Sequence, residues 1–124
     1  MKIAVAVYGI PRGAAIAVPS LIEKIISPAR ELDKVEVGLF GHFFLQDRVV
    51  NPRSNENGPL SYDSYSFFQS FKLVVEQPVH CLKTWHFNCL QDYGDAWTDN
   101  LRSLANVVHA LHSLRKGTLM VEEF

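Results

Sequence analysis

The chain has little cysteine, no long apolar run and almost no net charge, and each of these absences excludes a class of protein. Its two cysteines, Cys81 and Cys89, are too few for a disulfide scaffold and favour a reducing, cytoplasmic compartment. No apolar run approaches the roughly 18 residues of a membrane span, and the N-terminus lacks the pattern of a signal peptide. A net charge of −1 over 124 residues gives no general attraction to nucleic acid or to an anionic membrane. Any anion site must therefore be local.

Several catalytic motifs are also missing. The sequence holds no Walker loop, no G-x-G-x-x-G, no nucleophile elbow, no zinc-protease motif and no Asp-x-Asp. The composition, 48% hydrophobic and 20% charged, is ordinary for a globular protein. A length of 124 residues is enough for one domain and too short for two. We therefore predict a single α/β domain over 1–124, with a Rossmann-like parallel sheet of three or more strands and flanking helices.

The opening stretch organises this prediction. Residues 2–8 form an almost unbroken apolar run that ends in Gly9-Ile10-Pro11-Arg12-Gly13, which predicts a strand buried on both faces. Such strands are typical of parallel sheets covered by helices on both sides. Ligands of these sheets bind beyond the carboxyl ends of the strands, so this loop lies where a site is expected. Arg12 is its only cation, and the alternative is a tight strand-to-helix turn with a solvated arginine.

A helix over 19–27 and a second strand over 35–44 are predicted to complete a β-α-β unit. The apolar positions of the helix recur at helical spacing: Leu21, Ile22, Ile25 and Ile26. Pro28 predicts that the regular helix ends or kinks at Ser27. His42 lies near the carboxyl end of the second strand, where it is either a candidate site residue or a packed structural histidine.

The stretch 46–70 is predicted to be a long irregular loop. It holds two prolines, Gly58 and three asparagines, and a loop of this length is usually functional or partly disordered. Its turn sequence Asn51-Pro52-Arg53-Ser54 could present Arg53 to a ligand, and its aromatic residues are expected to pack onto the domain. A third strand at 71–76 follows, because its residues are rich in β-branched side chains.

The segment 79–93 contains His80, Cys81, His86 and Cys89, which raises the question of a metal site. Their spacing is not the paired Cys-x-x-Cys of a zinc site. We therefore predict an amphipathic packing segment here and assign no metal ligands.

The clearest predicted helix spans 98–116. Thr98 or Asp99 can cap its start, and it ends near Lys116-Gly117 or runs on toward Glu122. Three polar residues of this helix lie three or four positions apart and therefore share one face: Asn106, His109 and Ser113. That face is either the solvated side of the helix or, if it meets the Arg12 loop, part of a site.

Several stretches together resemble a family of bacterial glycosyltransferase-like proteins of surface polysaccharide biosynthesis. The resembling features are the opening strand followed by Tyr8-Gly9-x-Pro11-Arg12, the helix ending in Ile25-Ile26-x-Pro28, the second strand ending in Gly41-His42-Phe43, and the late helix L-R-S-L-A-N-V-V-H-A-L-H-S-L. The likeness spans nearly the whole chain.

The resemblance implies the amino-terminal half of the nucleotide-sugar transferase fold called GT-A. In that fold the loop after the first strand holds the nucleotide of an activated sugar, so the donor-binding role falls on Gly9, Pro11 and Arg12. A helix role falls on Asn106 and His109. Arginine offers a planar fork to phosphate oxygens and stabilises the departing diphosphate, and Arg53 is a candidate for a second charge.

Two histidines, His42 and His109, are the candidates for proton transfer. Transferases of this type place a metal-binding acidic motif on a strand after the late helix, whereas this sequence reaches Phe124 about where that strand would begin. The resemblance thus covers the amino-terminal part of the fold, as a fragment or a shortened relative. A divalent metal is implied only if such a motif follows, and no other cofactor is implied.

Three functions compete at this point. The first is a glycosyltransferase-like domain that binds a nucleotide-diphosphate sugar, with its catalytic competence and oligomeric state open. The second is a non-catalytic α/β binding or interaction module, which the missing acidic motif favours. The third is another nucleotide-using enzyme of doubly wound type, which the absence of a glycine-rich fingerprint disfavours. None of the three calls for nucleic acid or a membrane span.

Overall fold

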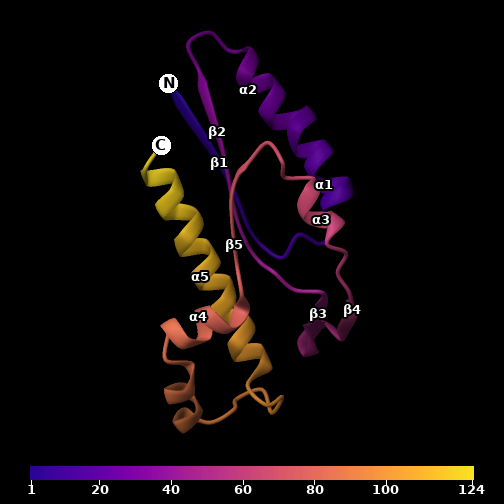
Figure 1. Cartoon of the computed structure of the whole chain (residues 1–124), viewed down its shortest axis with the longest axis vertical. Coiled ribbons are helices and arrows are strands. Elements are labelled where there is room, and N and C mark those ends of the chain that lie inside the picture. Colours follow the sequence, from indigo (N-terminus) through magenta and orange to yellow (C-terminus); the bar gives the residue numbers. More distant parts are fainter.

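The computed structural model describes residues 1–124 and has a central parallel sheet (Figure 1). Its strands are β1 (Lys2–Gly9), β2 (Glu36–Phe44) and β5 (Lys72–Glu76), in the order β1-β2-β5. Both neighbouring pairs are parallel. The predicted α/β class, the three strands and their parallel pairing are therefore confirmed. The prediction that the first strand is buried on both faces is wrong, because β1 is an edge strand and none of its residues is fully buried. None of the helices combines the length and apolarity needed to cross a bilayer.

Helices cover both faces of the sheet (Figure 1). On one face, α1 (Ala14–Leu21), the π-helical turn η1 (Ile22–Ile26) and α2 (Ser27–Glu31) follow one another without a break. On the other face lies the long α5 (Arg102–Glu122). The chain termini come together at the amino ends of the strands, so the opposite end of the sheet is left for the loops that form a site.

The first helical segment is longer than the predicted 19–27 at both ends. It begins at Ala14, directly after Gly13, whose φ of 71° is a left-handed conformation that glycine adopts without steric cost. The predicted end of the helix at Ser27 is wrong, because Ser27 keeps helical angles, φ −63° and ψ −49°. The wider π turn of η1 ends at Ile26, two residues before Pro28, and the helix continues through the proline instead of ending.

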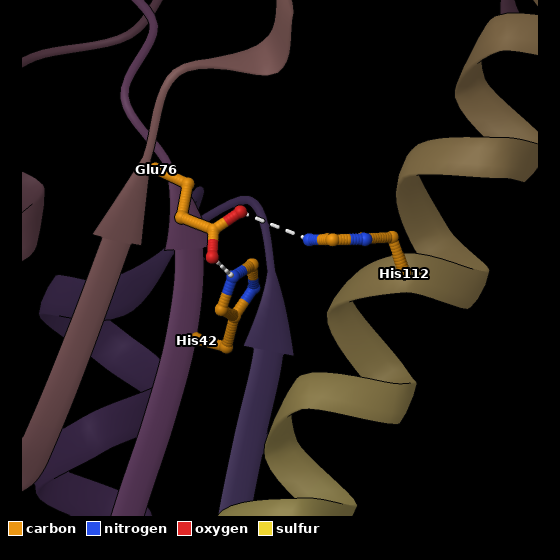
Figure 2. A group of neighbouring side chains, drawn as sticks. All are labelled: His42, Glu76 and His112. Carbon is orange, nitrogen blue, oxygen red and sulfur yellow. Dashed lines mark hydrogen bonds and ion pairs between the residues drawn. The ribbon is translucent and has the colours of Figure 1, made fainter. Parts of the chain in front are cut away.

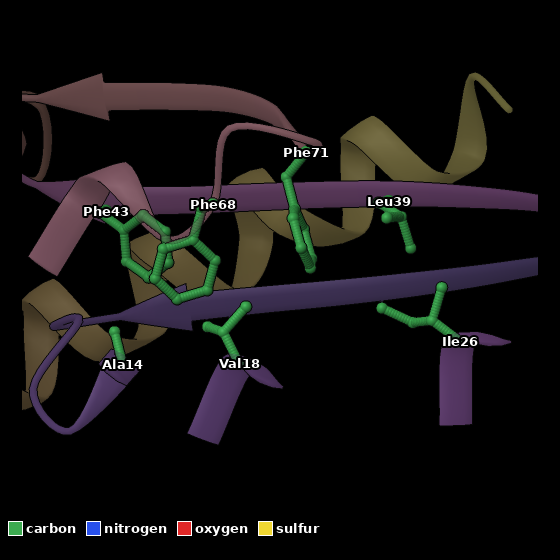
Figure 3. Packing of buried hydrophobic residues seen from close by; sticks show 7 residues of the cluster. All are labelled: Ala14, Val18, Ile26, Leu39, Phe43, Phe68 and Phe71. Atoms are coloured by element: carbon green, nitrogen blue, oxygen red, sulfur yellow. The ribbon is translucent and has the colours of Figure 1, made fainter. Parts of the chain in front are cut away.

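The apolar core lies between the sheet and the α1–α2 segment (Figure 3). It comprises Ala14, Val18, Ile26, Leu39, Phe43, Phe68 and Phe71. Because side chains alternate along a strand, the odd-numbered residues of β2 enter this core and the even-numbered ones face α5. The α5 side is different in kind, since its buried groups include the polar His42, His112 and Ser113.

The 46–70 stretch is not the irregular loop that its composition predicts. It contains an antiparallel hairpin of β3 (Arg48–Asn51) and β4 (Glu56–Pro59), followed by the short helix α3 (Asp63–Ser66). The turn sequence is confirmed, because the Asn51 side chain accepts a hydrogen bond from the Arg53 amide at 3.2 Å. Tyr65 anchors the region by donating from its hydroxyl to the Phe44 carbonyl at 2.5 Å.

The C-terminal third of the chain is mostly helical. α4 (Pro78–Thr84) and the 3-10 segment η3 (Phe87–Tyr93) precede α5. α5 starts later than the predicted residue 98 and runs on to Glu122, the longer of the two predicted ends. The N-cap is Leu101 and not the predicted Thr98 or Asp99. Asp99 still supports the first turn, because its carboxylate accepts hydrogen bonds from the amide and the hydroxyl of Ser103 at 3.1 and 2.6 Å.

Candidate functional site

A cleft of about 380 Å³ opens at the carboxyl ends of β1 and β2, within the size range of small-molecule sites. Five segments line it: the end of β1 with the β1–α1 loop, the end of β2 with the residues that follow it, β3, the first residue of α4, and α5. The lining residues used below are Tyr8, Gly9, Arg12, Val50, Asn106 and His109. This confirms that the Arg12 loop, the end of the second strand and part of 46–70 share one cleft.

Arg12 is the only cation that lines the cleft. Its guanidinium forms an ion pair with Glu56 of β4, and its side chain is half exposed. An ion pair this exposed contributes only about 0–1 kcal/mol, so a competing anion can displace the carboxylate at little cost. α1 begins two residues after Arg12, which places the positive end of that helix at the same end of the sheet.

Asn106 and His109 bring α5 into the cleft, on the shared face that their spacing predicts. The Asn106 amide donates to the Val50 carbonyl at 3.3 Å and so links the helix to the hairpin. His109 Nε2 lies 3.2 Å from the Pro78 carbonyl, which can only accept, so Nε2 carries the proton and Nδ1 is the acceptor of the neutral ring. Burial lowers the pKa of His109, and the bond to Pro78 offsets part of that effect. His109 therefore gives the cleft an acceptor instead of a charge.

Three of the predicted site residues lie outside the cleft lining. Pro11 is buried within the β1–α1 loop. Arg53 sits in the short helix η2 (Pro52–Ser54), with its guanidinium 6.0 Å from the Trp97 ring. His42 is fully buried behind Phe44, whose ring centroid is 5.3 Å away, because β2 continues two residues past His42 before it ends.

A polar cluster lies behind Phe44 and comprises His42, Glu76, His112, Ser113 and Lys116. Figure 2 shows the first three of these side chains. Glu76 is the register partner of Phe44, so its side chain lies on the face of the sheet that His42 occupies. Its carboxylate lies 2.9 Å from His112 Nε2, 3.1 Å from Lys116 Nζ and 3.6 Å from His42 Nε2. The cluster therefore joins two strands to α5.

Trp85 fixes where the proton of His112 resides. The indole nitrogen can only donate, and it lies 2.9 Å from His112 Nδ1. Nδ1 is therefore the acceptor, and Nε2 carries the proton that His112 donates to Glu76.

Ser113, His42 and Glu76 have the order of a hydrolase triad, but Ser113 cannot act as a nucleophile. Its side chain is 0% exposed. Its oxygen accepts from the Gly9 amide at 3.1 Å and lies 2.9 Å from the His42 carbonyl and 2.7 Å from His42 Nδ1. The hydroxyl is thus enclosed and saturated by the protein, and its role is to tie α5 to the ends of β1 and β2.

The ionisation states of the cluster follow from burial and hydrogen bonding. Burial by itself would raise the pKa of Glu76, but hydrogen bonds from His112 and Lys116 outweigh it and hold that pKa below its ordinary value. Burial lowers the pKa of His42, and the Glu76 carboxylate offsets part of this. At neutral pH the cluster accordingly holds an ionised carboxylate beside an uncharged His42.

The sequence prediction missed Glu76 and His112, although each carries a signal. Glu76 is the last residue of the third strand, where side chains reach the carboxyl edge of the sheet. His112 and Lys116 lie four residues apart on one helix and therefore share a face. The histidines and cysteines of 79–93 form no such group. Cys81 is buried, and burial, followed by the nearby Glu76 charge, raises its pKa to about 11, whereas Cys89 is exposed.

The geometry thus combines a small-molecule cleft, one exchangeable cation at its wall and a buried polar cluster beside it. Parallel α/β sheets covered by helices occur in proteins of many unrelated functions, so the fold alone does not identify an activity. Comparison of the chain with models of protein families, with curated proteins and with solved structures gave no match.

Proposed function

We propose that the chain is a glycosyltransferase-like domain whose cleft binds the nucleoside diphosphate part of a nucleotide sugar. The observation that carries this is the convergence of Arg12, Asn106 and His109 on one cleft at the carboxyl ends of β1 and β2. A parallel sheet binds its ligands at that edge. An arginine that is free to leave its surface ion pair suits a diphosphate, because its planar fork matches the phosphate oxygens.

The remaining walls of the cleft suit the other parts of such a ligand. The Tyr8 ring is half exposed at the cleft and offers a face for stacking of a nucleobase, a contact worth about 1–3 kcal/mol in nucleic-acid-binding proteins. Asn106 can donate to or accept from hydroxyl groups of the ribose or the sugar. His109 has an unprotonated Nδ1, the form that a general base requires.

Replacing Arg12 by alanine is expected to weaken binding of a nucleoside diphosphate about ten- to a hundredfold. A charge-assisted hydrogen bond contributes about 1.5–3 kcal/mol, and its loss appears directly in the dissociation constant. Arg12→Lys should restore binding only in part, because lysine lacks the fork. The measurement is a calorimetric titration of UDP, GDP, ADP and CDP into each protein, with and without manganese.

Arg30→Ala is the matched control, since it removes an exposed arginine from α2. It should leave the affinity unchanged. Equal affinities of the native protein and Arg12→Ala would remove Arg12 from the site. If a folded chain bound none of the four nucleotides, the nucleotide-binding proposal would be abandoned.

Replacing Glu56 by glutamine is expected to strengthen nucleotide binding by up to about fivefold. The carboxylate competes with the ligand for Arg12, and its ion pair is worth about 0–1 kcal/mol. The same change in the Arg12→Ala background should have no effect, because there is no cation left to compete for. A loss of affinity in the single variant would show instead that Glu56 holds the cleft in shape.

The alternative function, a non-catalytic interaction module, rests on the same ion pair. Arg12 is already partnered by Glu56, so its role could be to pin β4 to the β1–α1 loop. In that case Arg12→Ala would lower the midpoint of thermal unfolding, while the native protein would show no nucleotide binding.

A further inference from the structure

Three side chains with metal-binding chemistry meet at one point on the α5 side of the sheet (Figure 2). They are His42 of β2, Glu76 at the end of β5 and His112 of α5. One ligand atom from each lies within 4.8 Å of the other two. This group is separate from the nucleotide cleft, so its test does not depend on the proposed function.

His42 supplies an independent sign that the group is incomplete. Its side chain is 0% exposed, and Nε2 has no hydrogen-bond partner, the only buried side-chain polar atom in the chain of which this is true. Nδ1 is held by Ser113 at 2.7 Å, so the ring is fixed with Nε2 directed at the Glu76 carboxylate 3.6 Å away. A hydrogen bond at the far nitrogen is the usual way in which a metal-binding histidine is oriented.

We propose that His42, Glu76 and His112 form a binding site for a zinc-class divalent cation. Two imidazoles and one carboxylate suit Zn²⁺, and also Co²⁺ as its spectroscopic substitute. The nitrogen-to-oxygen separations of 2.9 and 3.6 Å already approach those around one ion with bonds of about 2.0–2.2 Å. No two of the three ligand atoms are more than 4.8 Å apart, so closing the remaining separation would bring them into one coordination sphere.

Two neighbours hold the site in its metal-free arrangement. Lys116 places its ammonium 3.1 Å from Glu76 and supplies the positive charge that an ion would bring. Trp85 donates to His112 Nδ1, so the proton of His112 occupies Nε2, the atom that would bind metal. When Nε2 binds a metal, the one proton of the neutral ring moves to Nδ1, so the indole loses its acceptor. Lys116 then turns outward. Both side chains are partly exposed and can make these movements.

The test is a titration of untagged, chelator-treated protein with Zn²⁺ by calorimetry, and with Co²⁺ by visible absorption. We expect one ion per chain. Glu76→Gln and His42→Ala should each weaken zinc binding by more than about tenfold. Replacing a residue that only hydrogen-bonds to a metal ligand already lowers metal affinity by about that factor, and these two residues are proposed ligands. Lys116→Met and Trp85→Phe should each strengthen it about two- to tenfold, the worth of the hydrogen bond that no longer has to be broken.

The background variant His80→Ala/His86→Ala/Cys89→Ser removes the other accessible zinc ligands around α4 and should bind as the native protein does. Glu76→Gln keeps the size of the side chain, so it remains informative even if His42→Ala does not fold. Zinc affinity that is unchanged in Glu76→Gln would overturn the proposal. Weaker zinc binding in both Lys116→Met and Trp85→Phe would also overturn it. That result would mean that these two side chains do not compete with the metal, and that the cluster serves only to hold α5 against the sheet through its hydrogen bonds.

Discussion

Replacing Phe43 by alanine is expected to lower the free energy of unfolding by about 3–5 kcal/mol, a large part of the 5–15 kcal/mol typical of a domain. Phe43 is 2% exposed and belongs to the core between the sheet and α1. Its ring centroid is 4.7 Å from that of Phe68 and 6.1 Å from that of Tyr65. Truncation therefore leaves a cavity that these rings cannot fill, and chemical denaturation followed by circular dichroism measures the loss.

Phe67→Ala is the matched control for this change. Phe67 lies next to Phe68 in the sequence but is 40% exposed, so its removal takes little apolar area out of the core and should cost less than about 1 kcal/mol. A similar loss in both variants would contradict the prediction, because the exposed Phe67 would then contribute as much to stability as the buried Phe43.

The parallel sheet could be predicted because its strands are local signals. The runs at 2–8, 35–44 and 71–76 are apolar and bounded by Gly, Pro or polar residues, and this pattern needs no knowledge of distant contacts. The position of the cleft could be predicted in the same way. Ligands of parallel sheets bind beyond the carboxyl ends of the strands, and Gly9 and Arg12 follow the carboxyl end of the first strand. The ion pair between Arg12 and Glu56 could not be predicted, because the two residues lie 44 positions apart and no local pattern links them.

The errors have a common physical cause. The helix boundary at Ser27 and the irregular 46–70 loop were judged from proline and asparagine content, which describes local preference and not the packing that overrides it. The β3–β4 hairpin is held to the domain by the long-range contact between Asn106 and Val50. Only local turn chemistry, such as the Asn51 side chain accepting from the Arg53 amide, could be read in advance.

The polar cluster was beyond sequence reasoning for a related reason. Residues 35–44 read as one apolar run without alternation, so the pattern does not tell which face His42 occupies. The answer depends on the register between strands, which pairs His42 with Val74 and Phe44 with Glu76. It depends equally on the rotation of α5, which turns His112 and Ser113 toward the sheet while leaving Leu111 exposed.

Replacing Ser113 by alanine is expected to lower the free energy of unfolding by about 2–6 kcal/mol. The change removes the acceptor of the Gly9 amide and the only partner of the His42 ring, whose Nε2 is already without one. Each buried polar group left unsatisfied costs about 1–3 kcal/mol. Because Gly9 lines the cleft, the β1–α1 loop should also lose its fixed position. If the cleft binds a nucleoside diphosphate as we propose, that affinity should fall with the stability.

Thr118→Ala is the matched control, since it removes a hydroxyl from the same helix. Thr118 is exposed and its hydroxyl donates only to the Leu114 carbonyl, so the variant reports the gain in helix propensity that alanine brings and should be neutral or slightly stabilising. Denaturant unfolding of both variants, followed by UDP titration of the folded proteins, separates the two effects. If Ser113→Ala were as stable as Thr118→Ala, water would have to replace the hydroxyl between Gly9 and His42. α5 would then be held to the sheet by its apolar contacts and by the Glu76 cluster instead of by this one oxygen.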